Sequence, residues 1–445
     1  MLLKRKYTIL LLLLVVAYGN LYAQDSTLIG KSVVWDLVKC INYAKDNNIQ
    51  INSLRLSQKT SQQEFLLAKA AKLPDLTGTA SQDFGHANTR GTSGTGSSGI
   101  YASGNYGVSS NVTLYNGNLL NNNISQKNLA IESANLNIIQ QENDVTLQVT
   151  QAYLAILLDK ETIIYDQDLV SVSTAQVKQA QQKYDAGSIA RKDLIQLQAQ
   201  QSTDKYTLIT AQNQERQDLL TLKQLLILPG GASFDIVKPD TVIAKQPVAP
   251  FQEVEQTALQ TRPEIKNGQI GVQIAKFDVL KARAGYKPSL TAGGALSTGY
   301  TTGNGAFYNQ FNNNFTQQLG LNLTVPIFTK RVVKTQVEEA KIGVDQAQLT
   351  FRDTKLVLSQ TVERAYISVL NAQSQYDAAL EGYKYNQEGY RIVNEQLKVG
   401  VANIVDFLQQ KNLFIQAQQQ YVQAKYNALL TAKIYDFYKG VPIKL

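Results

Sequence analysis

The segment YDAGSIARKDL, residues 184–194, decides the fold, because it returns later in the chain as LKVGVANIVDFL, residues 397–408. In each copy a glycine (Gly187, Gly400) precedes an aspartate (Asp193, Asp406) by six residues, and the two copies lie 213 positions apart. Gln151-Ala152-Tyr153 and Arg364-Ala365-Tyr366 obey the same shift. Repetition at a fixed shift indicates that the chain is two copies of one structural unit.

Both copies predict the same order of elements, with a proline where each first helix ends (Leu73-Pro74, Lys287-Pro288). Each copy is expected to hold a helix, two strands, a very long helix, a turn and a returning helix. Repeat 1 (24–228) should have helices at about 49–72, 119–185 and 190–228, and strands at about 76–84 and 104–115. Repeat 2 (262–445) should have helices at about 262–286, 330–398 and 403–438, and strands at about 290–300 and 315–328. Residues 229–261 are rich in proline and glycine, which favours a mostly irregular linker.

The long helices carry apolar residues at seven-residue spacing, which predicts that helices pack on one another as coiled coils. The series are Val149, Ile156, Ile163, Val170, Val177 and Tyr184 in the first copy, and Val362, Val369, Tyr376, Tyr383, Tyr390 and Leu397 in the second. A helix over 119–185 would be roughly 100 Å long, several times the width of a compact domain. The two shorter helices of each copy should therefore stack end to end beside it. We interpret the tyrosines as packing residues rather than as a stacking surface for aromatic cargo.

The predicted strands alternate between apolar and polar residues, which is the pattern of a strand with one apolar face. Tyr106, Val108, Val112 and Leu114 are expected to share one face of the second strand, and Leu319, Leu321, Leu323, Val325 and Ile327 one face of the fourth. A half-buried strand of a soluble sheet would also alternate. Aromatic residues near the strand ends and long polar loops at 85–103 and 301–314 favour membrane strands instead.

Four strands per chain are too few to close a membrane barrel, since single-chain bacterial barrels begin at about eight strands. Unpaired strand edges are costly in lipid, so several copies must share one barrel. Two copies would give a barrel filled by its own side chains, whereas a conducting duct favours three or more. The residues alone leave the number of copies open.

The first 23 residues resemble a secretory signal peptide, with a basic start at 4–6, an apolar core at 9–17 and a small-residue cleavage site at 21–23. Its removal would lower the net charge from +8 to +5, and the remaining basic residues are scattered, so we expect no nucleic-acid partner. The residue directly after the cleavage site is Gln24 rather than a cysteine, and Cys40 is too far downstream, so no lipid anchor is expected at the new N-terminus. Beyond residue 23 no apolar stretch has the length of a membrane helix, so any membrane-spanning part must be made of strands.

This arrangement resembles the TolC family of outer-membrane efflux proteins over essentially the whole mature chain. The resemblance is carried by the two glycine–aspartate turns, the helix ends at Pro74 and Pro288, the strand end Val325-Pro326-Ile327-Phe328, and the segment Arg262-Pro263-Glu264-Ile265. It implies a mixed helical and β membrane protein, a homotrimer with a shared twelve-stranded β-barrel and a periplasmic helical tunnel. It also implies passive export across the outer membrane of substrates delivered by an inner-membrane pump through a periplasmic adaptor.

The resemblance assigns roles to residues near the two turns. The tips, with Gly187 and Gly400, would form the closed end of the tunnel and contact the adaptor. Asp406 matches a position that contributes an acidic ring to the constriction. Asp193 is also a candidate there. For both acids the alternative is a position near a helix start, where an acid interacts favourably with the helix dipole. We favour that alternative for Asp193, and the constriction role for Asp406 on the resemblance.

The chain departs from the best-known family member at three of these positions. Gln409 replaces a second acidic ring, Ala402 replaces a gate arginine, and Lys192 replaces a gate threonine. We keep Gln409 and Lys192 as candidate constriction residues, but the family's gating contacts cannot all be present.

Several other signals are interpreted without a special function. The GTGSSG motif at 94–99 does not link a buried strand to a helix, so it is interpreted as a loop, and His86 as a surface residue. Cys40 is interpreted as a buried structural thiol. One histidine and one cysteine give no metal site or catalytic triad, so we expect no cofactor and no enzyme activity. The alternatives to an export duct are a periplasmic adaptor protein and a structural coiled-coil protein.

Overall fold

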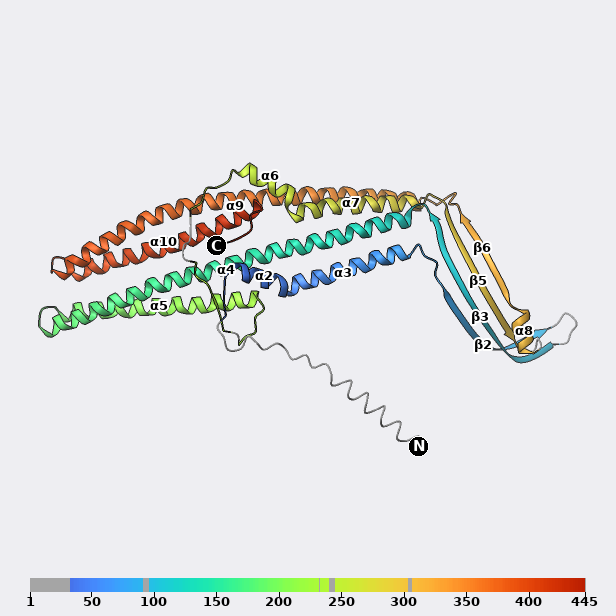
Figure 1. Ribbon diagram of the computed structural model, residues 1–445, viewed down its shortest axis with the longest axis horizontal. Helices are drawn as coiled ribbons and strands as arrows, with labels where there is room; N and C mark the ends of the chain where they lie inside the picture. The colour runs from blue at the N-terminus through green and yellow to red at the C-terminus, as the bar shows by residue number, and fades with distance from the viewer. Residues whose placement is uncertain (1–32, 91–95, 232, 240–244, 303–305, 445) are drawn as a thin grey trace, which may run out of the picture.

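Two helices of equal length run along the whole helical part of the molecule (Figure 1). They are α4 (Leu119–Asp185) and α9 (Val332–Lys398), each 67 residues long, and at 1.5 Å per residue each spans roughly 100 Å. This computed structural model describes residues 33–90, 96–231, 233–239, 245–302 and 306–444. Within those residues, none of the helices is both long and apolar enough to cross a membrane.

The remaining elements belong to the two repeats or to the segment that links them. Repeat 1 contributes β1 (Val33–Trp35), α2 (Leu37–Asn47), α3 (Ile49–Ala70), β2 (Thr77–Arg90), β3 (Gly96–Asn116) and α5 (Arg191–Leu225). The segment between the repeats contributes β4 (Phe234–Ile236) and α6 (Phe251–Thr261). Repeat 2 contributes α7 (Pro263–Ala284), β5 (Ser289–Thr301), α8 (Phe307–Asn313), β6 (Thr316–Thr324) and α10 (Ile404–Tyr438).

The helices form one curved layer that is four helices wide. Near the sheet the order across the layer is α3, α4, α7, α9, and near the far end it is α5, α4, α10, α9. The short helices α3 and α5 therefore stack end to end along α4, and α7 and α10 do the same along α9, as predicted from the helix lengths. Apolar side chains remain exposed along α9, where Ile342, Leu349 and Leu356 lie seven residues apart and are each more than half exposed.

Local sequence explains where the long helices begin and end. Each begins at a residue with left-handed backbone, Asn118 for α4 and Arg331 for α9. Each ends in a glycine turn: Gly187 has φ +74° and Gly400 has φ +78°, a conformation that costs glycine least. Helix α7 begins with Pro263 in its first turn, where the missing N–H of proline does no harm.

The largest core lies at mid-length, where repeat 1 packs on the chain that links the repeats. Strands β1 and β4 form a parallel pair there, and the Tyr153 hydroxyl donates a 2.6 Å hydrogen bond to the backbone carbonyl of Val237. Cys40 belongs to this core with no exposed surface, which confirms the structural-thiol interpretation. Burial raises the pKa of its thiol to about 12, so the group stays protonated and unreactive.

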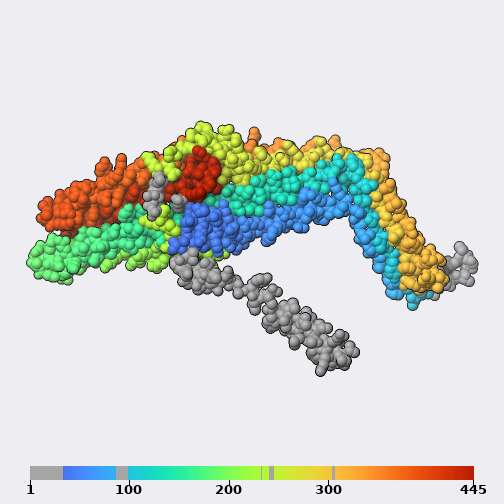
Figure 2. All heavy atoms as spheres, in the orientation of Figure 1, coloured from blue at the N-terminus to red at the C-terminus, as the bar shows by residue number. Residues whose placement is uncertain are grey.

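The four long strands form one antiparallel sheet in the order β2-β3-β5-β6, which projects at an angle from the end of the helical rod (Figure 1, Figure 2). Its register places Val112 opposite Ala292, and Ala292 opposite Leu321. One prediction for the faces is wrong. A β-bulge lies between Thr113 and Tyr115, so Leu114 is the extra residue and Tyr115 comes opposite Leu290.

Other predicted boundaries need correction. The expected loop 85–103 is largely strand, because β2 continues to Arg90 and β3 begins at Gly96, where cross-strand hydrogen bonds outweigh the weak strand preference of glycine and serine. The expected loop 301–314 contains α8. Strand β6 ends at Thr324 rather than near 328, two residues before Pro326, which has no N–H to donate to a ladder.

The linker 229–261 is also less irregular than predicted, because α6 occupies its last eleven residues. Val254 and Ala258, four residues apart, are fully buried on one face of α6, and this amphipathic pattern outweighs the nearby prolines. The predicted signal peptide at 1–23 lies outside the described residues, as does part of the GTGSSG motif. His86 is exposed, as predicted, although it lies on β2 rather than in a loop.

Candidate functional site

The sheet has two chemically different faces. One, the apolar face, carries residues that include Val108, Val112, Leu296, Leu319, Leu321 and Leu323. The other, the polar face, carries residues that include Thr79, Ser81, Ser109, Asn111, Thr291 and Asn322. Leu319 is 90% exposed and Leu321 72% exposed. A large exposed apolar surface of this kind marks an interaction surface. An apolar face suits contact with lipid, and a polar face suits contact with water, as in the wall of a membrane barrel.

Among the residues that the structure describes, neither edge of the sheet has a neighbouring strand. Strand β2 lies at one edge and β6 at the other, so each has a row of backbone N–H and C=O groups without a neighbouring strand. In lipid these groups must be satisfied by other strands. The edges lie on opposite sides of the same sheet, so the β6 edge of one copy can pair with the β2 edge of another.

The two hairpin tips lie together at the end of the rod farthest from the sheet (Figure 1). Asp193 is in the first turn of α5 and Asp406 in the first turn of α10. Asn403 caps α10: its Oδ1 accepts from the Asp406 N–H at 2.9 Å, and its Nδ2 donates to the Asp406 carboxylate at 2.7 Å. Asp406 therefore acts as a helix-start residue, as was expected for Asp193. Its side chain remains exposed, as do those of Lys192 and Gln409.

An apolar cluster joins the tips of the two hairpins. Phe407 is fully buried in it, beside Leu194 and Leu197 of α5 and Tyr390 of α9, whose ring centre is 5.7 Å away. Phe407 follows Asp406 directly, so the same helix turn that exposes the carboxylate buries the ring. Asp193 and Asp406 thus lie on neighbouring hairpins, and the helix starts that carry them, in α5 and α10, pack on the same apolar cluster.

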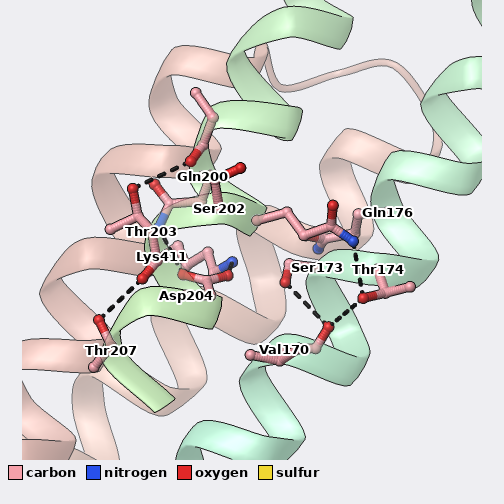
Figure 3. Close-up of polar contacts among 12 residues, drawn as sticks. Val170, Ser173, Thr174, Gln176, Gln200, Ser202, Thr203, Asp204, Thr207 and Lys411 are labelled. Atoms are coloured by element: carbon pink, nitrogen blue, oxygen red, sulfur yellow. Dashed lines mark hydrogen bonds and ion pairs between the residues drawn. The ribbon is translucent and has the colours of Figure 1, made fainter. Parts of the chain in front are cut away.

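Further from the tips, a buried ion pair connects the hairpins (Figure 3). The Lys411 ammonium of α10 lies 2.7 Å from a carboxylate oxygen of Asp204 on α5, and neither side chain is more than 1% exposed. Gln200 donates to the other Asp204 oxygen at 2.8 Å. Sequence reasoning missed this pair. The signal was available, because Lys411 lies four residues after Phe407 and three before Phe414, two aromatic residues that are themselves seven apart and so share one face of α10.

A second ion pair repeats this contact two heptads along α10. Lys425 donates to both oxygens of Glu161 on α4, at 2.8 and 2.9 Å, and the Tyr426 hydroxyl adds a 2.8 Å hydrogen bond. Glu161 is 7% exposed. Helix α10 is therefore held against the first hairpin by two lysines on one helical face.

The first hairpin also buries carboxylates that form no ion pair with a lysine in the described part of the chain. Burial, with a smaller effect of nearby Asp204, raises the pKa of Asp166 to about 6. Burial, followed by the influence of the neighbouring Asp218, raises the pKa of Asp159 to about 8. These groups lie on α4 and α5, between the tips and the middle of the rod.

Comparison with known proteins decides the family. The model of the outer membrane efflux protein family matches residues 40–226 and 254–433, which cover most of both repeats. The chain belongs to the outer membrane efflux protein family. The predicted family, and with it the predicted outer-membrane location, are confirmed.

Individual family members are distant relatives. The chain is 22% identical over 396 residues to outer membrane efflux protein BepC of Brucella suis, covering 87% of this chain and 82% of that protein. It is 26% identical over 301 residues to toxin and drug export protein A of Aggregatibacter actinomycetemcomitans, covering 67% of this chain. That match spans 63% of the relative's length, and the match to the Escherichia coli outer membrane protein TolC spans 60%.

Solved structures of efflux channels have the same fold. The crystal structure of CusC superposes with a TM-score of 0.78 at 16% identity, covering 94% of this chain and 95% of that chain. The Campylobacter jejuni CmeC outer membrane channel gives a TM-score of 0.74 at 18% identity, covering 95% and 91%. The predicted fold class, long helical hairpins joined to a strand domain, is confirmed.

Proposed function

We propose that this outer membrane efflux protein is the exit duct of a multipart efflux or secretion system, assembled as a homotrimer with a shared twelve-stranded barrel. The observation that carries the proposal is the sheet: an exposed apolar face, a polar face and two unpaired edges at one end of a helical rod. Three copies of a four-stranded sheet, joined edge to edge, would enclose the polar faces around an aqueous pore. The exposed apolar heptad along α9 supports a matching helix-to-helix contact between copies.

The rod would then form the periplasmic tunnel, with the hairpin tips at its inner end. Relatives named for toxin, drug and protease export are the basis for proposing passive export of substrates that a pump delivers. An adaptor would engage the tips around Gly187 and Gly400, and Asp406, with Gln409, Asp193 and Lys192 nearby, would lie at the constriction. Three Asp406 carboxylates in a narrow passage would favour cations. Asp406→Asn should therefore reduce cation preference in planar bilayers, and an unchanged reversal potential would remove Asp406 from the constriction.

The sheet itself supplies a matched pair of variants to test the duct. Leu321→Arg places a charge on the apolar face, at a cost of roughly 2–4 kcal/mol near the bilayer midplane, and should abolish assembly in the outer membrane. Asn322→Arg, on the next residue but on the polar face, should assemble and export normally. Membrane fractionation and heat-resistant migration on a gel measure assembly. If both variants assemble equally well, the apolar face does not contact lipid. That result would favour a periplasmic adaptor or a structural coiled-coil protein over an export duct.

A further inference from the structure

Helix α8 lies against the apolar face of the sheet at the end farthest from the helical rod (Figure 1). The ring of Phe307 is 4.7 Å from that of Tyr300 on β5, and the ring of Phe311 is 6.0 Å from that of Tyr106 on β3. Tyr106 pairs with Thr298, two residues from the pair Val108–Leu296, so these rings belong to the apolar face. The helix therefore covers the side that would meet lipid in the proposed duct.

Helix α8 also replaces β6 beside the end of β5. The β5–β6 ladder stops at the pair Ser297–Thr316, and the last backbone groups of β5 bond to side chains of the α8 segment instead. The Thr301 N–H donates to Oε1 of Gln310 at 2.8 Å, and Nδ2 of Asn314 donates to the Gly299 carbonyl at 2.7 Å. Because backbone groups of the sheet depend on it, α8 is a fixed part of this surface.

The position of α8 along the strands matches the edge of a bilayer. Thr298, whose hydroxyl donates to the Phe311 carbonyl, lies nine residues beyond Ser289 at the rod end of β5. Nine residues of strand tilted by about 40° rise roughly 23 Å, close to the apolar band of about 25 Å in outer-membrane barrels. Helix α8 would thus lie where the hydrocarbon core gives way to headgroups on the outer side.

The outward surface of α8 has the composition of a membrane interface. Tyr308 is 81% exposed, Phe307 54% and Phe311 40%, and the helix sequence FYNQFNN contains no charged residue. This surface continues the apolar face beyond Val108 and Leu296. Aromatic rings with amide side chains beside them suit the boundary between acyl chains and headgroups. There a ring can contact the apolar chains while the polar groups next to it stay hydrated.

We propose that α8 is an interfacial anchor that seats Phe307, Tyr308 and Phe311 among the lipids at the outer surface of the membrane. It would fix how deeply the sheet sits in the bilayer at the one place where β6 is too short to do so. The proposal uses the outer-membrane location and does not depend on what is exported.

Tryptophan fluorescence tests this directly, because the chain has a single tryptophan, Trp35, which is buried at mid-length of the rod. Tyr308→Trp in the full-length protein, placed in phospholipid nanodiscs, should lose about half of the added emission when the lipids carry bromine near the headgroup. The unchanged protein gives the Trp35 background. Ser81→Trp is the matched control, since Ser81 pairs with Asn105, and Asn105 with Gly299, at the same level on the polar face.

Phe311→Trp is a ring-for-ring second probe on α8 and should behave like Tyr308→Trp. Quenching at both α8 positions and not at Ser81 supports the anchor. Emission at position 308 that bromine leaves unchanged, in variants that still assemble by heat-resistant gel migration, would overturn it. Helix α8 would then face water or a second copy of the chain. Loss of assembly in Leu321→Arg is measured separately, so failure of the anchor leaves the proposed duct intact.

Discussion

The two helical hairpins have the same geometry and different interiors. Hairpins α4/α5 and α9/α10 each combine helices of 67 and 35 residues, and α9 begins 213 residues after α4. Between α9 and α10 a continuous row of rings packs with neighbouring centres 5.0–5.9 Å apart. These rings are Tyr376, Tyr383, Tyr390, Phe407, Phe414 and Tyr421. The equivalent residues of the first hairpin are Ile163, Val170, Val177, Leu194, Gln201 and Leu208.

The first hairpin lacks this row of rings and instead buries acids at other positions, which correspond to Ala379, Ala417 and Ser374 of the second hairpin. Asp166, Asp204 and Glu161 lie in its interior or on the surface it shares with α10, and two lysines of α10 neutralise the latter two. After duplication the lengths and turns were therefore kept while the packing chemistry diverged. The second hairpin is held together mainly by aromatic packing, and its contact with the first depends on buried charge. The difference can be tested by changing either the buried charges or the aromatic rings.

The largest effect is expected at the buried ion pair. Lys411→Met leaves Asp204 buried without its cation. Because an uncompensated charge then remains in the interior, this variant should destabilise the helical rod by about 3–5 kcal/mol. Chemical unfolding of the detergent-solubilised protein, followed by circular dichroism, measures this. Lys398→Met, which removes an exposed ion pair with Glu395, is the matched control and should change stability by less than about 1 kcal/mol.

The double variant Lys411→Met with Asp204→Leu separates charge from packing. Replacing both partners with apolar residues should recover most of the loss, since no uncompensated charge remains. A double variant as unstable as Lys411→Met would show that Lys411 contributes chiefly through shape.

Sequence periodicity predicted the rod well and the ion pairs not at all. Heptads, turn glycines and the 213-residue shift each report on local geometry, so they located α4, α9 and both tips to within a few residues. Lys411 and Asp204 are 207 residues apart, and their pairing depends on which helices are neighbours. Periodicity cannot supply that. The bulge at Leu114 and the packing of α8 were missed for a related reason, because both are set by partner strands rather than by the segment itself.

A second test uses pH. The pKa of Asp166 is raised to about 6, first by burial, whereas the same group in the unfolded chain has its usual pKa near 3.8. Between these values the folded protein keeps a proton that the unfolded chain releases. Stability should therefore fall as pH rises from about 4 to 6, by about 3 kcal/mol in total, and stay lowered above pH 6.

Asp166→Asn should remove this part of the pH dependence and raise stability at pH 7. Unfolding curves at pH 5 and pH 7 for both proteins provide the comparison. Asp168→Asn, at an exposed position two residues further along α4, is the matched control. Equal pH dependence in the Asp166→Asn variant and the unchanged protein would mean that the buried acid of the first hairpin does not set the difference between the hairpins.

The aromatic row gives a smaller effect that should be confined to one hairpin. Phe414 stacks on Tyr390 with ring centres 5.1 Å apart and also contacts Tyr383. Phe414→Leu removes both ring pairs and should cost about 1–2 kcal/mol. Gln201→Leu, the equivalent change in the first hairpin, removes only a 2.9 Å hydrogen bond to Thr174 and should be close to neutral. Hydrogen exchange of α10 and α5 measures both. Similar losses in the two hairpins would refute the aromatic contribution.

The smallest effect is expected where the two hairpins remained alike. Gly187 and Gly400 have φ of +74° and +78°, and a methyl group at either would meet no atom within 4 Å. Alanine there should therefore cost only the strain of a left-handed backbone, about 1 kcal/mol, and the same amount at both tips. The turn hydrogen bonds Ser188 N–H to Lys183 C=O and Val401 N–H to Gln396 C=O should exchange faster by equal factors. A clearly larger effect of Gly400→Ala would show that the second tip makes contacts the first lacks, and that divergence between the repeats extends to the turns themselves.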